Sequence, residues 1–490
     1  MTIKQLHTGD NLVVLRGINS ESIDLIYLDP PFNPGKQWEN PIEAQGKKAV
    51  AQFKDVWTLQ DINKEEHELL ADEYPELASI IEAMGVVNGG SWKSYMIYMS
   101  VRLVEMRRIL KPTGSIYLHC DSTMSHGLKL AMDAIFGRKN FRNEIIWQRN
   151  DGRGKGSQHE SKKFGANTDT ILFYTKTNTF SLEINIPLSD EEEIEKKFNK
   201  VDENGRRYHS GIPLFCSKSM GARPNLCYEW HGFRNPHPSG WRLSRERMDE
   251  EHDKGNIVID GSKIERRKYF DDYEGMPLDN NWTDIPRLTG QKSSYYPTQK
   301  PDALLERIIT ASSKKGDVVL DPFCGCATAM IAAEKLGRQW IGLDISQKAA
   351  EIVRMRLERE CLILFDEVQH FTKPPERTDI TEKRTPNKQL KPALYKKQKG
   401  KCAGYCNESG KGGRKVDEDL MEIDHIIARS KGGLDIDSNL QLLCGTCNKI
   451  KGNRGMRYLK REYIVRRLKA HDSGVSADII SGERTDEKTD

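Results

Sequence analysis

Four consecutive residues, Asp29-Pro30-Pro31-Phe32, place a carboxylate, two prolines and an aromatic ring directly after an apolar run with strand composition. Because the prolines hold the backbone in a stiff, extended turn, we expect Asp29 and Phe32 to be presented at the end of that strand. Such a turn suits transfer of a group to the exocyclic amine of a nucleobase. The Asp29 carboxylate and the Pro30 carbonyl would accept the two amine protons, and Phe32 would stack on the base. The alternative is a turn that only ends a strand.

A second motif lies far along the chain, where a strand-like run ends in Asp321-Pro322-Phe323-Cys324-Gly325-Cys326-Ala327-Thr328. An Ala-rich helix and a second strand ending in Asp344 follow, which is the order of a mononucleotide-binding half of a doubly wound sheet. Small residues let the backbone approach a ligand, and Asp344 would accept hydrogen bonds from ribose hydroxyls. The turn lacks the glycine pattern of a dinucleotide site, which favours a nucleoside-type cofactor over NAD. Asp321, Phe323, Gly325 and Asp344 are therefore candidate cofactor-binding residues.

With these two motifs the chain resembles the S-adenosylmethionine-dependent DNA amino-methyltransferases of the permuted beta class, in which the Asp-Pro-Pro-Tyr/Phe motif precedes the cofactor motif. Residues 296–301 match the motif that opens the cofactor half in that family, so the resemblance assigns Thr298, Lys300 and Pro301 to cofactor binding. It implies transfer of a methyl group to adenine N6 in double-stranded DNA. Asp at the first catalytic position favours adenine in this family, and cytosine N4 is the alternative. Ala327 departs from the last glycine of the family's FxGxG motif, at little cost unless that position needs a positive φ.

Four cysteines form a C-x3-C pair and a C-x2-C pair near the end of the sequence: Cys402, Cys406, Cys444 and Cys447. This count and pairing are typical of a closed tetrahedral zinc site. A module of this length buries little apolar surface, so bound zinc would supply much of its folding energy.

The segment of about 395–456 that contains these cysteines resembles a zinc-stapled HNH endonuclease, because Asp424-His425 and Asn439 lie between the pairs and Asn448 follows the last cysteine. The resemblance implies that His425 activates the attacking water and that Asn439 orients the loop bearing His425. It also implies that Asp424 and Asn448 hold a divalent ion, Mg²⁺ or similar, on the scissile phosphate. Asn448 stands where the family commonly has a histidine. A zinc-stapled module that binds DNA without cleaving it is the alternative.

Composition limits the class of protein. The 490 residues are 37% apolar and 30% charged, with no apolar run of the ~18 residues that cross a bilayer and no signal-peptide core, so we expect a cytoplasmic protein. The formal net charge is +4, but residues 371–490 carry +8 and residues 1–370 carry −4. The last part of the chain therefore has the basic character expected of a DNA partner.

The order of these motifs predicts an α/β protein: a doubly wound, Rossmann-like methyltransferase sheet with an inserted target-recognition region, followed by a small ββα-metal HNH domain. The expected segments are 1–175 (catalytic half), 176–295 (target recognition), 296–370 (S-adenosylmethionine-binding half), 371–392 (linker), 393–470 (HNH domain with a basic helix) and 471–490 (disordered tail). In the insertion, aromatic residues such as Trp230 and Trp241 could read bases or could equally form the core of that region. The sequence does not reveal the oligomeric state.

Overall fold

The structure is a computed structural model that describes residues 2–31, 38–44, 47–53, 64–149, 164, 166–186, 191–288, 299–362, 367–382, 384–407, 412–429 and 433–472. Phe32 and Thr298 lie outside these residues. The chain forms two compact units, residues 1–182 with 280–490, and residues 183–279. Within the described residues, no helix has the length and apolar character needed to span a membrane.

A nine-stranded sheet organises the first unit, in the order β15-β6-β7-β5-β2-β16-β17-β1-β18. All neighbouring pairs are parallel except those of β7, which runs opposite to β5 and β6. The strands are β1 Lys4–Thr8, β2 Ile23–Leu28, β5 Leu110–Cys120, β6 Phe141–Gln148, β7 Thr168–Thr175, β15 Asn281–Trp282, β16 Val318–Asp321, β17 Gln339–Asp344 and β18 Gln369–Phe371. Because β2, β16 and β17 are adjacent and parallel, their carboxyl ends meet at one edge of the sheet.

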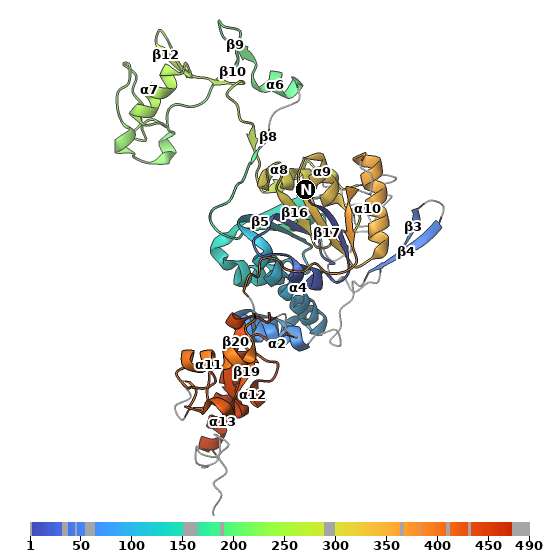
Figure 1. Ribbon diagram of the computed structural model, residues 1–490. Helices are drawn as coiled ribbons and strands as arrows, with labels where there is room; N and C mark the ends of the chain where they lie inside the picture. The colour runs from blue at the N-terminus through green and yellow to red at the C-terminus, as the bar shows by residue number, and fades with distance from the viewer. Residues whose placement is uncertain are drawn as a thin grey trace, which may run out of the picture. The chain divides into compact units, whose positions relative to one another are not determined.

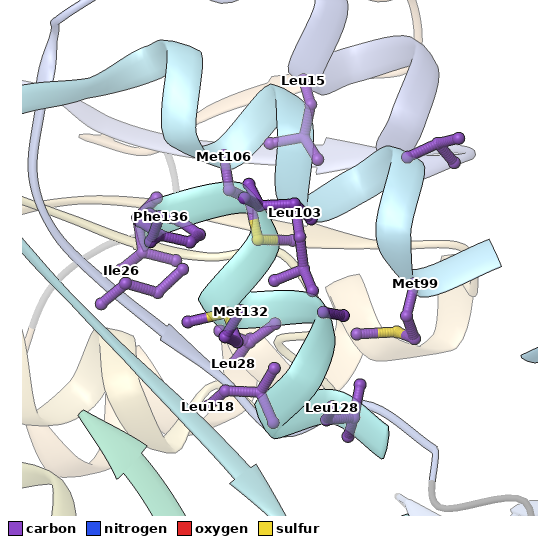
Figure 2. Close-up of a cluster of buried hydrophobic side chains, with 14 of the residues drawn as sticks. Leu15, Ile26, Leu28, Met99, Leu103, Met106, Leu118, Leu128, Met132 and Phe136 are labelled. Carbon is purple, nitrogen blue, oxygen red and sulfur yellow. The ribbon is translucent and has the colours of Figure 1, made fainter. Parts of the chain in front are cut away.

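Helices cover both faces of this sheet (Figure 1). Alternate residues of β2 enter different cores: Ile26 and Leu28 pack into one apolar cluster, and Leu25 and Tyr27 into another. Figure 2 shows the first cluster, in which Met99, Leu103 and Met106 of one helix meet Ile26 and Leu28 of the strand. The helices of this unit before the HNH motif are α1 Asn11–Gly17, α2 Lys64–Glu73, α3 Pro75–Asn88, α4 Gly90–Ile109, α5 Ser125–Met132, α8 Asp302–Ser312, α9 Thr328–Lys335 and α10 Gln347–Glu360. A separate antiparallel hairpin pairs β3 Trp38–Ala44 with β4 Lys47–Phe53.

The second unit has a small core of its own. Trp230 is 2% exposed and Trp241 is 0% exposed, and both pack with Leu214, Met248 and Ile257. Their indole N–H groups donate to Asp249 and to the Tyr228 carbonyl, respectively, so both indoles serve the core and not the reading of bases. The elements are β8 Asn185–Ile186, α6 Glu191–Lys197, β9 Lys200–Val201, β10 Arg207–His209, α7 Arg245–Asp253, β11 Ile257–Asp260, β12 Lys263–Arg266, β13 Lys268–Tyr269 and β14 Met276–Pro277.

The HNH segment folds as two antiparallel strands followed by a helix, β19 Met421–His425, β20 Leu440–Cys444 and α12 Gly445–Lys451. It is flanked by α11 Asn387–Lys397 and α13 Met456–Asp472 (Figure 1). Leu390 lies in the stretch that the sequence suggests as a linker, yet it packs with Leu442 of β20. Pro392, the last residue of the expected linker, lies inside α11. The end of that stretch is therefore helical.

Arg356 connects two of the helices to the turn that follows β16. Its side chain is 1% exposed, and its guanidinium donates to the Cys326 carbonyl at 2.9 Å, to Glu360 at 2.8 Å and to Asp302 at 3.2 Å. A buried guanidinium of this kind is costly to remove, because its acceptors lose their partner inside the protein.

We predict that Arg356→Met lowers the free energy of unfolding by about 2–4 kcal/mol, because it removes the donor to the buried Cys326 carbonyl and the buried cation beside Asp302 and Glu360. Arg354→Met is the matched control: Arg354 lies on the same helix, is exposed and pairs with Glu358, so its loss should change stability by about 0.5 kcal/mol or less. Urea unfolding followed by circular dichroism measures both. Equal destabilisation of the two variants would contradict this role of Arg356.

Candidate functional site

Three carboxylates converge at the carboxyl edge of the large sheet. Asp29 directly follows β2, Asp321 ends β16 and Asp344 ends β17. Burial raises the pKa of Asp321 well above its ordinary value, and the negative charges of Asp29 and Asp344 raise it further. The parallel pairing of β16 with β2 and with β17 brings the two distant sequence motifs to this one edge.

Lys300 contacts the first of these carboxylates. Its ammonium donates to Asp29 Oδ2 at 2.5 Å, and both side chains are largely buried. Asp29 Oδ1 is also buried, and within the described part of the chain it accepts no hydrogen bond. One oxygen of Asp29 is thus held by a cation, while the other can accept a hydrogen bond from a bound molecule. Beside it, Pro30 is buried and Pro31 is half-buried.

The cofactor motif forms a tight turn. Asp344 accepts backbone N–H bonds from Gly325 at 2.9 Å and from Ser346 at 2.8 Å, and Asp321 accepts one from Phe323 at 2.9 Å. Desolvation raises the pKa of Asp344 to about 6, although these two N–H donors oppose the rise. Each carboxylate oxygen of Asp344 can accept a further hydrogen bond. Asp344 therefore fits the ribose hydroxyls of a nucleoside-type cofactor, which would donate to it. Pro301 is buried and precedes the first residue of α8.

The backbone conformation of Ala327 is unfavourable for any residue other than glycine. Its φ is 68°, in the left-handed region, at the N-terminus of α9. A non-glycine residue there costs about 1–2 kcal/mol, so the condition under which alanine would be harmless is not met. The turn keeps its shape because Cys324 and Ala327 are tied by backbone hydrogen bonds.

A buried polar chain lies next to Asp29 and carries no signal in the sequence. Tyr27 Oη lies 3.0 Å from His119 Nδ1, and His119 Nε2 lies 3.1 Å from Asp169 Oδ2. Burial raises the pKa of Tyr27, and the charge of Asp29 raises it further. The three residues come from β2, β5 and β7, so only the sheet pairing reveals them. Asp121, at the end of β5, instead caps a turn by accepting from Thr123 N at 2.9 Å.

The four paired cysteines form one cluster, in which all four sulfurs lie within 4.8 Å of one another and all four residues are buried. Gly404 lies in the first pair, where a Cβ would stand 2.5 Å from the Cys447 sulfur, so only glycine fits this knuckle. The Tyr463 hydroxyl of α13 lies 3.4 Å from the same sulfur. Four thiols at this spacing fit a tetrahedral zinc ion.

His425 ends β19 and meets an acidic residue that the sequence did not single out. Its Nε2 lies 2.9 Å from Asp435 Oδ1, and Arg429 donates to Asp435 Oδ2 at 2.6 Å. The hydrogen bond from Arg429, followed by that from His425, lowers the pKa of Asp435. The carboxylate orients the imidazole ring, and the Arg429 guanidinium lies 3.2 Å from the same Nε2.

Asn439 ties the loop after His425. Its Nδ2 donates to the carbonyls of Ile427 at 3.0 Å and Leu434 at 2.8 Å, and its Oδ1 accepts from Ile427 N at 2.9 Å. A single amide thereby joins Ile427, two residues after His425, to Leu434, which directly precedes Asp435.

The two expected ligands of a catalytic divalent ion are engaged by protein groups. The Lys451 ammonium contacts both oxygens of Asp424, at 3.2 and 3.1 Å, and Gln441 donates to Oδ2 at 3.0 Å. Asn448 donates through its Nδ2 to Glu422. A cation thus already contacts the Asp424 carboxylate, whereas the Asn448 contact uses its nitrogen and not its oxygen.

An open hollow of about 740 Å³ lies on the HNH segment, between the end of α11 and the strand-like stretch after the first cysteine pair. Four basic residues line it, Lys396, Lys399, Arg414 and Lys415, against one acidic residue, Asp417. This charge favours phosphate oxygens.

Comparison with known proteins agrees with both parts of the chain. The model of the N6/N4 DNA methylase family matches residues 23–355, and the HNH endonuclease model matches residues 402–454. A type II methyltransferase, M.EcaI of Enterobacter cloacae, is 33% identical over 269 residues, 54% of this chain and 57% of the relative. The Mod subunit of the type III restriction-modification enzyme StyLTI from Salmonella typhimurium is 28% identical over 68% of this chain and 50% of its own length. The chain therefore spans only about half of these two relatives.

A third relative is matched over most of its length. The DNA adenine methyltransferase YhdJ of Escherichia coli is 24% identical over 78% of this chain and 90% of the relative. Among solved structures, a putative DNA modification methylase from Thermus thermophilus in complex with S-adenosyl-L-methionine has a TM-score of 0.37 and 17% identity, over 76% of this chain and 98% of that one. With the family model covering residues 23–355, the chain belongs to the N6/N4 DNA methylase family and carries an HNH domain.

Proposed function

We propose that this protein is a DNA methyltransferase that transfers a methyl group from S-adenosylmethionine to adenine N6. The observation that carries the proposal is the asymmetry of Asp29, whose Oδ2 is held by Lys300 while its buried Oδ1 has no hydrogen-bond partner within the described residues. That oxygen is suited to accept an N–H of an exocyclic amine. Family membership supports methyl transfer, and the names of relatives such as the adenine methyltransferase YhdJ favour adenine over cytosine.

Asp29 and the Pro30 carbonyl would accept the two amine protons and draw the nitrogen toward tetrahedral geometry, which frees its lone pair. Transfer of the methyl group from sulfur to N6 would leave S-adenosylhomocysteine, and the displaced N6 proton would pass to solvent. S-adenosylmethionine, when bound, supplies the electrophilic methyl group; Asp344 and the turn at Phe323 and Gly325 would hold its ribose. Residues 176–295 are assigned, within this proposal, to recognition of the target sequence.

We further infer that the HNH domain nicks or cleaves DNA. The supporting observation is the His425–Asp435 contact at 2.9 Å, which suits an imidazole that takes a proton from an attacking water. Asn439 would keep the intervening loop in position, and the basic hollow lined by Lys396 and Lys399 would bind backbone phosphates.

The methyltransferase proposal predicts that Asp29→Asn lowers kcat for methyl transfer by about 10²-fold or more, because the amide oxygen would face the Lys300 ammonium and the NH₂ group, a donor, would then stand where Oδ1 accepts. Binding of S-adenosylmethionine, measured by calorimetry, should be retained. Asp121→Asn is the control, since that carboxylate ends a neighbouring strand but only caps a turn. The measurement uses labelled S-adenosylmethionine, mixed-sequence duplex DNA and base analysis of the product. Detection of N4-methylcytosine as the product would show that the target base is cytosine and not adenine.

The nuclease proposal predicts that His425→Ala abolishes nicking of supercoiled plasmid, a loss of about 10²-fold or more, while methyl transfer persists. Asp435→Asn should reduce nicking less, since it leaves the imidazole in place but removes its charged partner. His126→Ala, an exposed histidine outside the HNH domain, is the control. If wild type and His425→Ala convert plasmid equally with Mg²⁺ or Mn²⁺ present, the domain only binds DNA.

The cysteine cluster predicts one zinc ion per chain, measured by elemental analysis of the purified protein. Cys444→Ser should lose the zinc and render residues 387–472 sensitive to limited proteolysis, because the metal supplies folding energy there. Cys361→Ser is the matched control, since Cys361 lies outside the cluster. Zinc retained at wild-type level in Cys444→Ser would rule out the four-thiolate site.

A further inference from the structure

A lysine ammonium occupies the centre of the HNH motif. Lys451, the last residue of α12, places its Nζ 3.2 and 3.1 Å from the two oxygens of Asp424 and 2.8 Å from the His425 carbonyl oxygen. Three acceptors match the three protons of an ammonium group. The Lys451 side chain is 0% exposed and that of Asp424 is 10% exposed. The pair is therefore an interior ion pair, whose ammonium makes two hydrogen bonds and a third close contact with oxygen.

Such a pair is an expensive way to fill space. Moving an ammonium from water into the interior costs several kcal/mol, and an apolar side chain of similar volume in its place is often neutral or stabilising. Lys451 is thus present for its charge, and the only carboxylate it contacts through a described ion pair is Asp424. That carboxylate is the one the HNH resemblance assigns to a divalent ion.

The surrounding side chains complete this arrangement. Glu422 and Asp424 alternate along β19 and so share one face of the strand, against which α12 packs. From α12, Asn448 donates to Glu422, and Lys451, three residues later, donates to Asp424. Both carboxylates of this face are therefore paired with groups of one helix.

We propose that Lys451 is the resident cation of the HNH site, and that a divalent ion reaches Asp424 only by displacing the Lys451 ammonium. Two cations in contact with one carboxylate repel each other strongly in a partly buried site, so they compete for Asp424. The ion pair between Lys451 and Asp424 therefore keeps the affinity of Asp424 for a divalent ion low in the folded protein. This inference deepens the proposed nuclease function and rests on it, but it concerns metal binding, which is measured without DNA cleavage.

The test measures Mn²⁺ binding to the full-length, zinc-loaded chain. The electron paramagnetic resonance signal of free Mn²⁺ reports how much of the ion remains unbound. Lys451→Gln removes the charge but keeps an N–H donor for Asp424, and Lys451→Met removes both. Each should bind Mn²⁺ about 10-fold or more tightly than wild type. Lys449→Met is the matched control, because Lys449 is exposed on the same helix, and it should bind as wild type does.

A second substitution shows where the ion sits: adding Asp424→Asn to Lys451→Gln should abolish the gain. Equal Mn²⁺ affinity in wild type and both Lys451 variants would overturn the proposal, as would a gain that survives Asp424→Asn.

Retained zinc and circular dichroism report folding of each variant. If both Lys451 variants lose their zinc, acetylation of wild type decides. Mg²⁺ should then raise labelling of Lys451 relative to Lys449 in peptide mass spectrometry, and an unchanged ratio would refute displacement. Absence of nicking alone would count against the nuclease proposal and not against this one.

Discussion

The pairing of β2 with β16 is the contact on which the rest of the methyltransferase site depends. Leu25 pairs with Val319 and Ile26 with Leu320, so two segments far apart in the sequence run parallel and in register. Their carboxyl ends then meet, which brings Asp29 beside Asp321 and Asp344. Because side chains in a strand alternate between faces, a shift of one residue would turn Asp29 away from its partners. Burial of Leu25 and Ile26 in opposite cores fixes that register.

Much of this arrangement could be predicted from the sequence, because the informative residues stand at strand ends or in spaced pairs. Asp29, Asp344 and the four cysteines are of this kind. Lys300, Asp435 and Lys451 could not be given their contacts, since each meets a partner that only tertiary structure brings near. Ala327 shows a different limit. The sequence reveals the residue type, but the strain at this position depends on its positive φ angle, which only the structure gives.

The two candidate sites use lysine in a similar way for different ends. Lys300 holds one oxygen of Asp29 and leaves the other buried and available to a substrate. Lys451 contacts both oxygens of Asp424, and its charge opposes the approach of a second cation. The two ion pairs therefore differ in how many carboxylate oxygens the lysine engages, one in Asp29 and two in Asp424.

The point at which residues 183–279 interrupt the sheet has a consequence for diversification. The chain leaves the sheet after β7 and rejoins it at β15, and both strands lie on the side of β5 away from β16 and β17 in the strand order. No strand that bears a reactive carboxylate is split. Exchange of this segment for an unrelated one would therefore leave the pairing of β2, β16 and β17 in register, so that recombination could vary residues 183–279 without disturbing the strands that carry Asp29, Asp321 and Asp344.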